Sequence, residues 1–136
     1  MSTEHEYKPG DVVLAKIKGF PAWPGIITPD EHVPSDVLEE RPASKSRPLY
    51  TVRFFPAADY NWASARDMQP LTQSDISDFL AKTTKKTTEL YKAYEIARDP
   101  AQWNEEKNQI VKEHEEWLAN GGAREDDDEE EEEEEE

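Results

Sequence analysis

Residues 11–24 read Asp-Val-Val-Leu-Ala-Lys-Ile-Lys-Gly-Phe-Pro-Ala-Trp-Pro, and this stretch decides the fold. Its first half, residues 12–17, is rich in β-branched side chains and follows a Pro-Gly-Asp turn signal, which predicts a strand. Its second half places Trp23 between two prolines. Because Pro21 and Pro24 lack an N–H donor and fix φ, they hold the indole rigidly. We therefore predict a strand followed by a stiff segment that presents aromatic side chains.

Further short strands are predicted downstream. A proline-rich excursion separates the second from the third, since four prolines in residues 29–48 remove the donors that a sheet ladder needs. Short strands at this spacing favour a small barrel over a parallel sheet. The additional strands that we expect cover residues 23–28, 49–55, 61–65 and 68–71.

Apolar residues recur at helical spacing over residues 72–120. The first predicted helix has Thr72 or Ser74 as its N-cap, and the second is centred on residues 90–97. Asp99, as a capping carboxylate before Pro100, predicts the start of a third helix that ends at a Gly-Gly pair. Whether this third helix packs on the body is left open. Its two tryptophans, Trp103 and Trp117, are expected to pack along the helix rather than to contact a ligand.

The formal net charge of −16 is unevenly distributed. Residues 1–98 hold 13 Lys/Arg against 14 Asp/Glu, whereas residues 99–136 hold 3 against 18. The acidic total therefore does not exclude binding of the near-neutral body to nucleic acid. Residues 125–136 are all acidic, and a run of this kind favours disorder over a packed core.

The sequence contains no features typical of a catalytic or metal site. It has no cysteine, which excludes disulfides, Cys-ligated zinc and a thiol nucleophile. The three histidines are far apart, and neither a glycine-rich phosphate loop nor a nucleophile elbow is present. No apolar run resembles a signal peptide or approaches the length of a spanning helix. We expect an intracellular, soluble binding module, not an enzyme, with no cofactor, no metal and no membrane partner.

The pattern as a whole resembles the PWWP domain. The namesake motif corresponds to Pro21-Ala22-Trp23-Pro24, preceded by Gly10-Asp11 at the strand entry, by Lys16 and by Gly19-Phe20-Pro21. Later family features resemble Val52-Arg53-Phe54-Phe55, Trp62, Asp67-Met68-Gln69-Pro70 and the helical Ala93-Tyr94-Glu95. The resemblance covers residues 7–98. It is of the type found in fungal chromatin reader proteins, of which this chain is expected to be an N-terminal fragment. A chain that ends in a glutamate run is expected to be a fragment of a longer protein.

This resemblance implies an α+β fold, with a five-stranded SH3-like β-barrel of the Tudor type, a C-terminal helical bundle and a disordered acidic tail. The implied organisation is a disordered leader (1–6), the PWWP domain (7–98, with the barrel over 7–72 and helices over 73–98), an additional helix (99–122) and the tail (123–136). It also implies a nuclear chromatin reader. Its expected partners are a methylated histone tail, nucleosomal DNA bound without sequence preference, and subunits of a chromatin complex.

The methyl-lysine site of the family, carried over by position, is an aromatic cage. A trimethylammonium keeps its charge without N–H donors, so it is attracted to ring faces and loses little hydration. The implied cage consists of Phe20, Trp23 and Phe54 with Ile17 as an apolar wall. Many members have Gly-Asp after the aromatic pair, whereas here the first acid is Asp59, so either Asp59 substitutes for that acid or lysine recognition is weaker. Adjacent strand residues point to opposite faces, so one of Phe54 and Phe55 belongs to the core. Alternation alone would bury Phe54, whereas the family position buries Phe55; we follow the family.

Lysines near these motifs predict phosphate contacts. The candidates are Lys16, Lys18, Lys45, Arg47, Lys82, Lys85 and Lys86. A solvated charged face is an equally good interpretation of each cluster. The alternative function is a nonspecific DNA-binding or histone-interaction module with an unused cage. We also expect removal of the acidic run to tighten DNA binding, most clearly at low salt.

Overall fold

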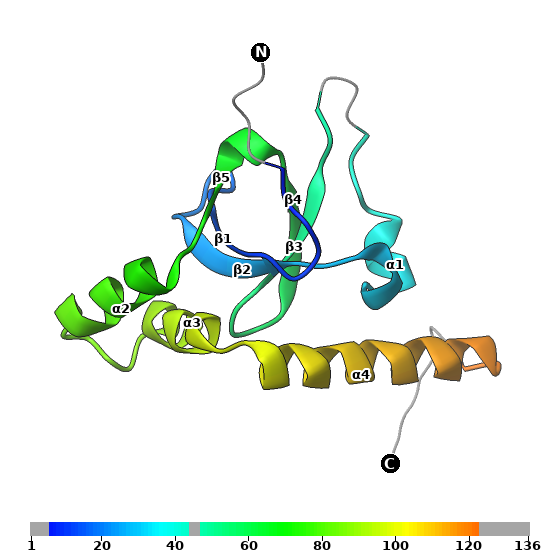
Figure 1. Ribbon diagram of the computed structural model, residues 1–136. Helices are drawn as coiled ribbons and strands as arrows, with labels where there is room; N and C mark the ends of the chain where they lie inside the picture. Colours follow the sequence, from blue (N-terminus) through cyan, green and yellow to red (C-terminus); the bar gives the residue numbers. More distant parts are fainter. Residues whose placement is uncertain (1–5, 44–46, 123–136) are drawn as a thin grey trace.

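The structure is a computed structural model that describes residues 6–43 and 47–122. A five-stranded antiparallel sheet is followed by three helices (Figure 1). The strands are β1 (Val12–Ala15), β2 (Trp23–Ile27), β3 (Tyr50–Phe54), β4 (Asp59–Ala63) and β5 (Met68–Pro70), and the helices that follow them are α2 (Gln73–Lys82), α3 (Glu89–Arg98) and α4 (Ala101–Ala119). The short elements between strands are η1 (Asp30–His32), α1 (Ser35–Leu38) and η2 (Ala65–Asp67). None of the helices in the described residues is long and apolar enough to cross a membrane.

The strand order is β4-β3-β2-β1-β5, and the sheet bends strongly on itself (Figure 1). The predicted barrel is not closed: in the part of the chain described, no ladder joins β4 to β5. Two features keep it open. Strand β5 has only three residues and ends at Pro70, which has no N–H to donate, and η2 carries the chain straight from β4 into β5.

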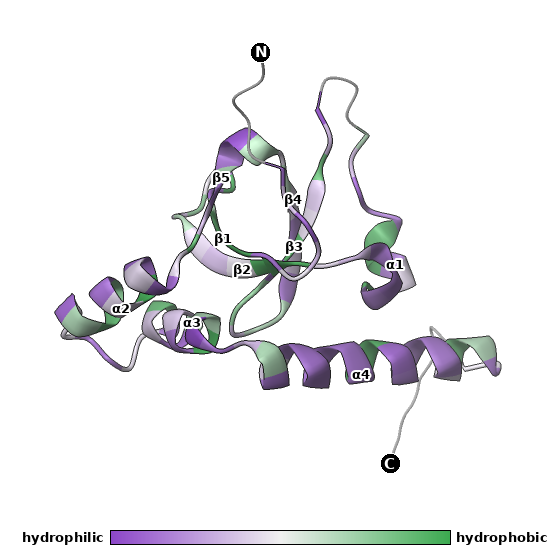
Figure 2. Cartoon of the chain, viewed as in Figure 1, coloured by the Kyte–Doolittle hydropathy of each residue, from purple (hydrophilic) through white to green (hydrophobic). Residues whose placement is uncertain are grey.

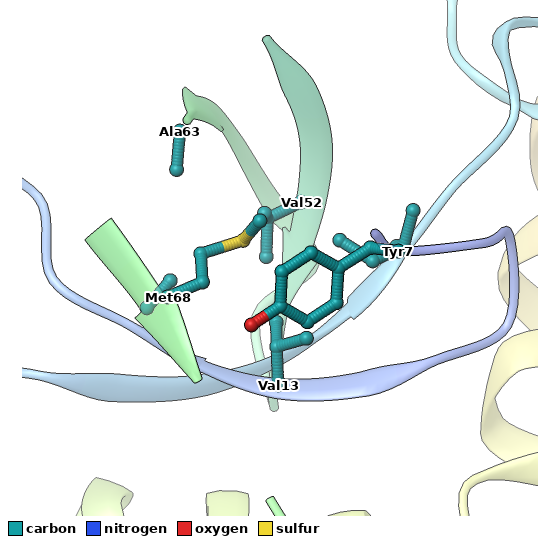
Figure 3. Close-up of a cluster of buried hydrophobic side chains, with 7 residues drawn as sticks. Tyr7, Val13, Val52, Ala63 and Met68 are labelled. Atoms are coloured by element: carbon teal, nitrogen blue, oxygen red, sulfur yellow. The ribbon is translucent and has the colours of Figure 1, made fainter. Parts of the chain in front are cut away.

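The concave side of the sheet holds the first core cluster (Figure 3). Tyr7, Val13, Val52, Ala63 and Met68 meet there, from the segment before β1 and from four strands. The ring of Tyr7 packs edge-on against Tyr50 at 5.5 Å, and burial raises the pKa of the Tyr7 phenol, with Tyr50 and Asp11 adding to the effect.

A second core cluster lies between the outer face of the sheet and the helices. Ile26 and Phe55 of the sheet region pack there against Ile76 of α2 and Tyr94 of α3, and the Tyr94 ring stacks on Phe79 at 3.8 Å. Thr72 caps α2 as predicted, in a reciprocal capping box with Asp75. The predicted excursion is confirmed, because residues 29–48 form no strand in their described part and instead fold into η1 and α1.

Helix α4 packs on the body, which answers the question that the sequence left open. Val111 is buried, and the Glu115 carboxylate accepts hydrogen bonds from the Ser35 N–H and Oγ. The predicted carboxylate cap from Asp99 is wrong: Pro100 occupies the cap position, and no side chain caps the helix. The predicted glycine stop is confirmed, with Gly121 at φ 92° and the Gly122 N–H bonded to the Trp117 carbonyl.

Most of the surface of α4 is hydrophilic (Figure 2). Trp103 near its start is partly buried in the second core cluster, whereas Trp117 near its end is 50% exposed. Trp117 stacks on His114 of the same helix at 5.9 Å. The expectation of helix packing therefore holds for both tryptophans, but only Trp103 reaches the body.

Candidate functional site

A pocket of about 410 Å³ opens at one end of the sheet. Its walls come from the end of β1, the loop between β1 and β2 and the first residue of β2, from the end of β3, the turn after it and the start of β4, and from the first residue of α3. All five residues of the predicted cage line it, which are Ile17, Phe20, Trp23, Phe54 and Asp59. The other lining residues include Pro21, Phe55, Pro56, Tyr60, Asn61 and Glu89.

The β1–β2 loop places Phe20 at the mouth of the pocket. Gly19 before it has φ 89°, a left-handed conformation that glycine adopts without strain. The Lys16 ammonium donates to the carbonyls of Ile17 and Phe20 and thereby ties the loop together. The Phe20 side chain is 63% exposed, so its ring is available to a ligand.

Trp23 is both a wall of the pocket and part of the second core cluster. It is the first residue of β2, its side chain is partly buried, and its indole N–H donates to the Phe55 carbonyl. The proline-braced position is therefore anchored more deeply than the sequence indicates. Truncation of Trp23 would remove core contacts together with the pocket wall.

Phe54 and Phe55 take the places that the family position implied. Phe55 is 1% exposed and packs in the second core cluster, whereas Phe54 is partly buried beside the first cluster and lines the pocket. Strand alternation misled because it assumes one buried face. Here Val52 and Arg53 are both fully buried, because the first core cluster covers one face of β3 and α4 and η1 cover the other.

The first two residues of β4, directly after the β3–β4 turn, bring a carboxylate and a further aromatic ring to the pocket. Asp59 is exposed, and Tyr60 is partly buried. Ala58 allows the tight reversal with φ 64° and an N–H bond to the Phe54 carbonyl of 2.8 Å. Sequence reasoning missed Tyr60, although an aromatic residue directly after the predicted acid was a usable signal.

Glu89 is the second residue that the sequence did not reveal. It is the first residue of α3, its carboxylate lies 3.6 Å from the Lys92 ammonium, and its side chain is largely exposed. Nothing in the local sequence connects Glu89 to the β1–β2 loop, because only the packing of α3 on the sheet brings them together. The lining residues thus include two carboxylates and no lysine or arginine.

The chemistry of this pocket suits a cation with an apolar surface. Five aromatic residues line it, which are Phe20, Trp23, Phe54, Phe55 and Tyr60, and Asp59 and Glu89 supply negative charge. A methylated ammonium satisfies both properties because it is positively charged and carries methyl groups in place of most or all N–H donors.

The predicted DNA-binding residues fall into separate groups. Lys16 and Lys18 are exposed on the pocket loop, although the Lys16 ammonium already bonds two carbonyls. Lys82, Lys85 and Lys86 are exposed around the α2–α3 connection, which leads directly to Glu89 at the pocket. Arg47 precedes β3 and so lies at the opposite end of that strand from Phe54. Lys45 lies outside the described residues.

A bent five-stranded sheet with helices on its outer face and an aromatic pocket at one end defines a small α+β domain. The PWWP domain family model matches residues 10–102, and the chain belongs to the PWWP domain family.

The similar proteins include chromatin-complex components. The chain is 39% identical over 92 residues to PWWP domain-containing protein 2 of Schizosaccharomyces pombe, covering 68% of this chain and 16% of that protein. It is 28% identical over 114 residues to the NuA3 HAT complex component PDP3 of Saccharomyces cerevisiae, covering 77% of this chain and 36% of that protein. The chain thus matches well under half the length of either relative.

A solved domain has the same arrangement of sheet and helices. The solution structure of the Pdp1 PWWP domain aligns with a TM-score of 0.55 at 29% identity, covering 75% of this chain and 92% of that chain. That domain is described as having binding sites for methylated H4K20 and DNA.

Proposed function

We propose that this chain is a chromatin reader module that binds a methylated histone lysine in the pocket and contacts nucleosomal DNA without sequence preference. The proposed mark is the trimethyl-lysine of transcribed genes. In this proposal the domain acts in the nucleus and recruits a larger chromatin-modifying or remodelling complex. The module binds and does not catalyse.

The observation that carries the proposal is the composition of the pocket. One cavity gathers five aromatic residues, the apolar Ile17 and two carboxylates, and the most exposed of its aromatic residues, Phe20, stands at the mouth. Packing within the domain does not explain why the Phe20 ring is exposed at this position. Contact with a bound cation would explain its position.

The energies require a second contact. A cation gains roughly 0.5 to 2 kcal/mol from each ring, so a few rings supply about 2 to 5 kcal/mol. This corresponds to dissociation constants between about 0.2 mM and some tens of millimolar for a free peptide. Phosphate contacts by lysines near the pocket would raise the effective concentration of the histone tail on the same nucleosome. The exposed Lys82, Lys85 and Lys86 support this part of the proposal.

The test compares methylated and unmethylated nucleosomes on identical DNA, using the full chain and the variant Phe20→Ala. The full chain is expected to bind methylated nucleosomes more tightly, and Phe20→Ala is expected to lose the preference while keeping its affinity for DNA and its melting temperature. Trp117→Ala is the matched control, because Trp117 is also an exposed aromatic residue but lies outside the pocket. An unchanged preference in Phe20→Ala would contradict the cage assignment.

The competing function is a DNA-binding or histone-interaction module with an unused cage. It is favoured by the exposure of the α2–α3 lysines, which does not depend on the pocket. Equal binding of the two nucleosomes would support the DNA-binding form. Binding of free histones that survives Phe20→Ala but is lost on removal of residues 125–136 would support the histone form.

A further inference from the structure

Helix α4 contacts the wall of the pocket at its outer side. The Trp103 indole N–H donates to the Pro56 carbonyl at 3.3 Å, and the Trp103 ring packs edge-on against Phe55 at 4.7 Å. Phe55 and Pro56 both line the pocket and begin the turn that leads into Asp59 and Tyr60 at the start of β4. The first turn of α4 therefore braces the β3–β4 turn from behind.

A second connection runs through Arg53, which is 0% exposed in the middle of the sheet. Its Nη1 donates to the side-chain oxygens of Asn104 at 2.6 Å and Asn108 at 2.8 Å, and its Nη2 donates to the His32 carbonyl at 2.7 Å. All of these acceptors are neutral. A buried guanidinium depends on such acceptors, since each donor left unsatisfied carries a desolvation penalty.

The same guanidinium holds Tyr60, a wall of the pocket. Arg53 Nε donates to the Tyr60 hydroxyl at 3.1 Å, and the guanidinium lies over the Tyr60 ring at 5.5 Å from its centroid. The two residues are also direct partners in the β3–β4 ladder. The position of the Tyr60 ring is thus set by an arginine whose own position is set by two asparagines of α4.

On the basis of the proposed function, we propose that Arg53 is a positioning residue for the methyl-lysine pocket and that α4 is part of the reading unit. The family match ends at residue 102, so almost all of α4 lies beyond it. Helix α4 fixes the β3–β4 turn through Trp103 and, by way of Arg53, fixes Tyr60. If α4 only stabilised the fold, disrupting its contacts would loosen the pocket residues and the rest of the sheet to the same extent.

The experiment uses three single variants of the full chain, Asn104→Ala, Asn108→Ala and Tyr60→Phe. Gln109→Ala is the matched control, because its exposed side chain bonds only Glu113 of the same helix in the described structure. Tyr60→Phe removes one hydroxyl and keeps the ring, so it reports on the coupling even if the asparagine variants fail to fold. The readouts are hydrogen exchange of the amides of residues 57–60 relative to those of β1 and β2, the preference for methylated nucleosomes, and the affinity for bare DNA.

Each of the three variants is expected to speed exchange of residues 57–60 by about tenfold, as expected for loss of one buried hydrogen bond. Exchange in β1 and β2 should stay within about twofold of the wild type, DNA affinity should be unchanged, and the methylated-nucleosome preference should fall about three- to tenfold. A uniform rise in hydrogen exchange across the sheet overturns the proposal. If the wild-type chain prefers methylated nucleosomes, the same preference in folded variants also overturns it. If the wild-type chain shows no preference, the proposed function fails, and the exchange of residues 57–60 alone decides whether α4 positions this turn.

Discussion

Phe54 and Phe55 are neighbours in the sequence and have different environments. Phe55 packs among the helices and strands of the second core cluster, whereas Phe54 sits at the edge of the barrel interior and reaches the pocket. The distinction depends on β3 being covered on both faces. On the outer face, Arg53 is fully buried and donates hydrogen bonds to neutral acceptors of α4 and η1.

We therefore expect Phe55→Ala to lower the free energy of unfolding by about 3 to 5 kcal/mol, because it removes a fully buried ring. Phe54→Ala should cost clearly less stability and should abolish the methylated-nucleosome preference. Urea denaturation of both variants together with nucleosome binding measures the difference. Equal losses of stability would show that Phe54 is a core residue and not a wall of the pocket.

Trp23 illustrates what the local sequence could not reveal. The two neighbouring prolines predict a rigid indole, but its contact with the helical cluster and its bond to the Phe55 carbonyl come from segments far away in the chain. A loss of binding in Trp23→Ala could therefore result either from a destabilised fold or from a damaged pocket. For this reason the exposed Phe20 is the better residue with which to test the cage.

Element positions were largely predictable, because they depend on local signals. The β-branched run, the prolines of the excursion and the glycine stop after α4 all act within a few residues, and all three predictions are confirmed. Barrel closure was not predictable, since it depends on how far β5 extends alongside β4. The contributions of Tyr60 and Glu89 to the pocket were missed for a similar reason: each depends on tertiary packing around Arg53 or α3.

The two helix caps offer a test at this scale. Thr72 forms a reciprocal box with Asp75, whereas the Thr88 side chain accepts one bond from the Tyr91 N–H. We expect Thr72→Ala and Thr88→Ala each to lower the free energy of unfolding by about 1 kcal/mol, and Thr72→Ala to have the larger effect. Chemical denaturation measures both, with the exposed, non-capping Thr87→Ala as the control. A neutral Thr72→Ala would show that α2 is held by packing alone.

At the scale of the whole molecule, α4 separates two charged regions. Its 19 residues span about 28 Å, and its C-terminal end lies at the opposite side of the molecule from the α2–α3 connection (Figure 1). The acidic residues 125–136 follow that far end in the sequence, and the lysines at residues 82–86 lie at the other side. For the acidic run to compete with DNA for these lysines, it would have to reach back over a distance comparable to the length of α4.

Replacing residues 125–136 with an uncharged run of equal length should tighten DNA binding, because it removes repulsion and competition with phosphate. The gain should be about two- to threefold at 0.15 M salt, where charges are screened beyond about 8 Å, and larger at low salt. The body alone should show a log–log salt slope of roughly −3 to −4. DNA affinity at two salt concentrations measures this, and equal affinities at low salt would contradict it. The methyl-lysine preference should not change, since the pocket lies on the sheet.

The charges of α4 itself give the described domain an electrical polarity along this helix, because α4 carries five glutamates and two lysines while three exposed lysines lie around the α2–α3 connection. Near a polyanion, the lysine-bearing end is expected to be attracted more strongly than the far end of α4, so the domain should experience a torque as well as a net force. We expect this torque to turn the pocket towards DNA before any contact is made. Association rates measured with and without residues 125–136 should consequently differ less than the charge of this run alone would predict, because the helices already set part of the orientation.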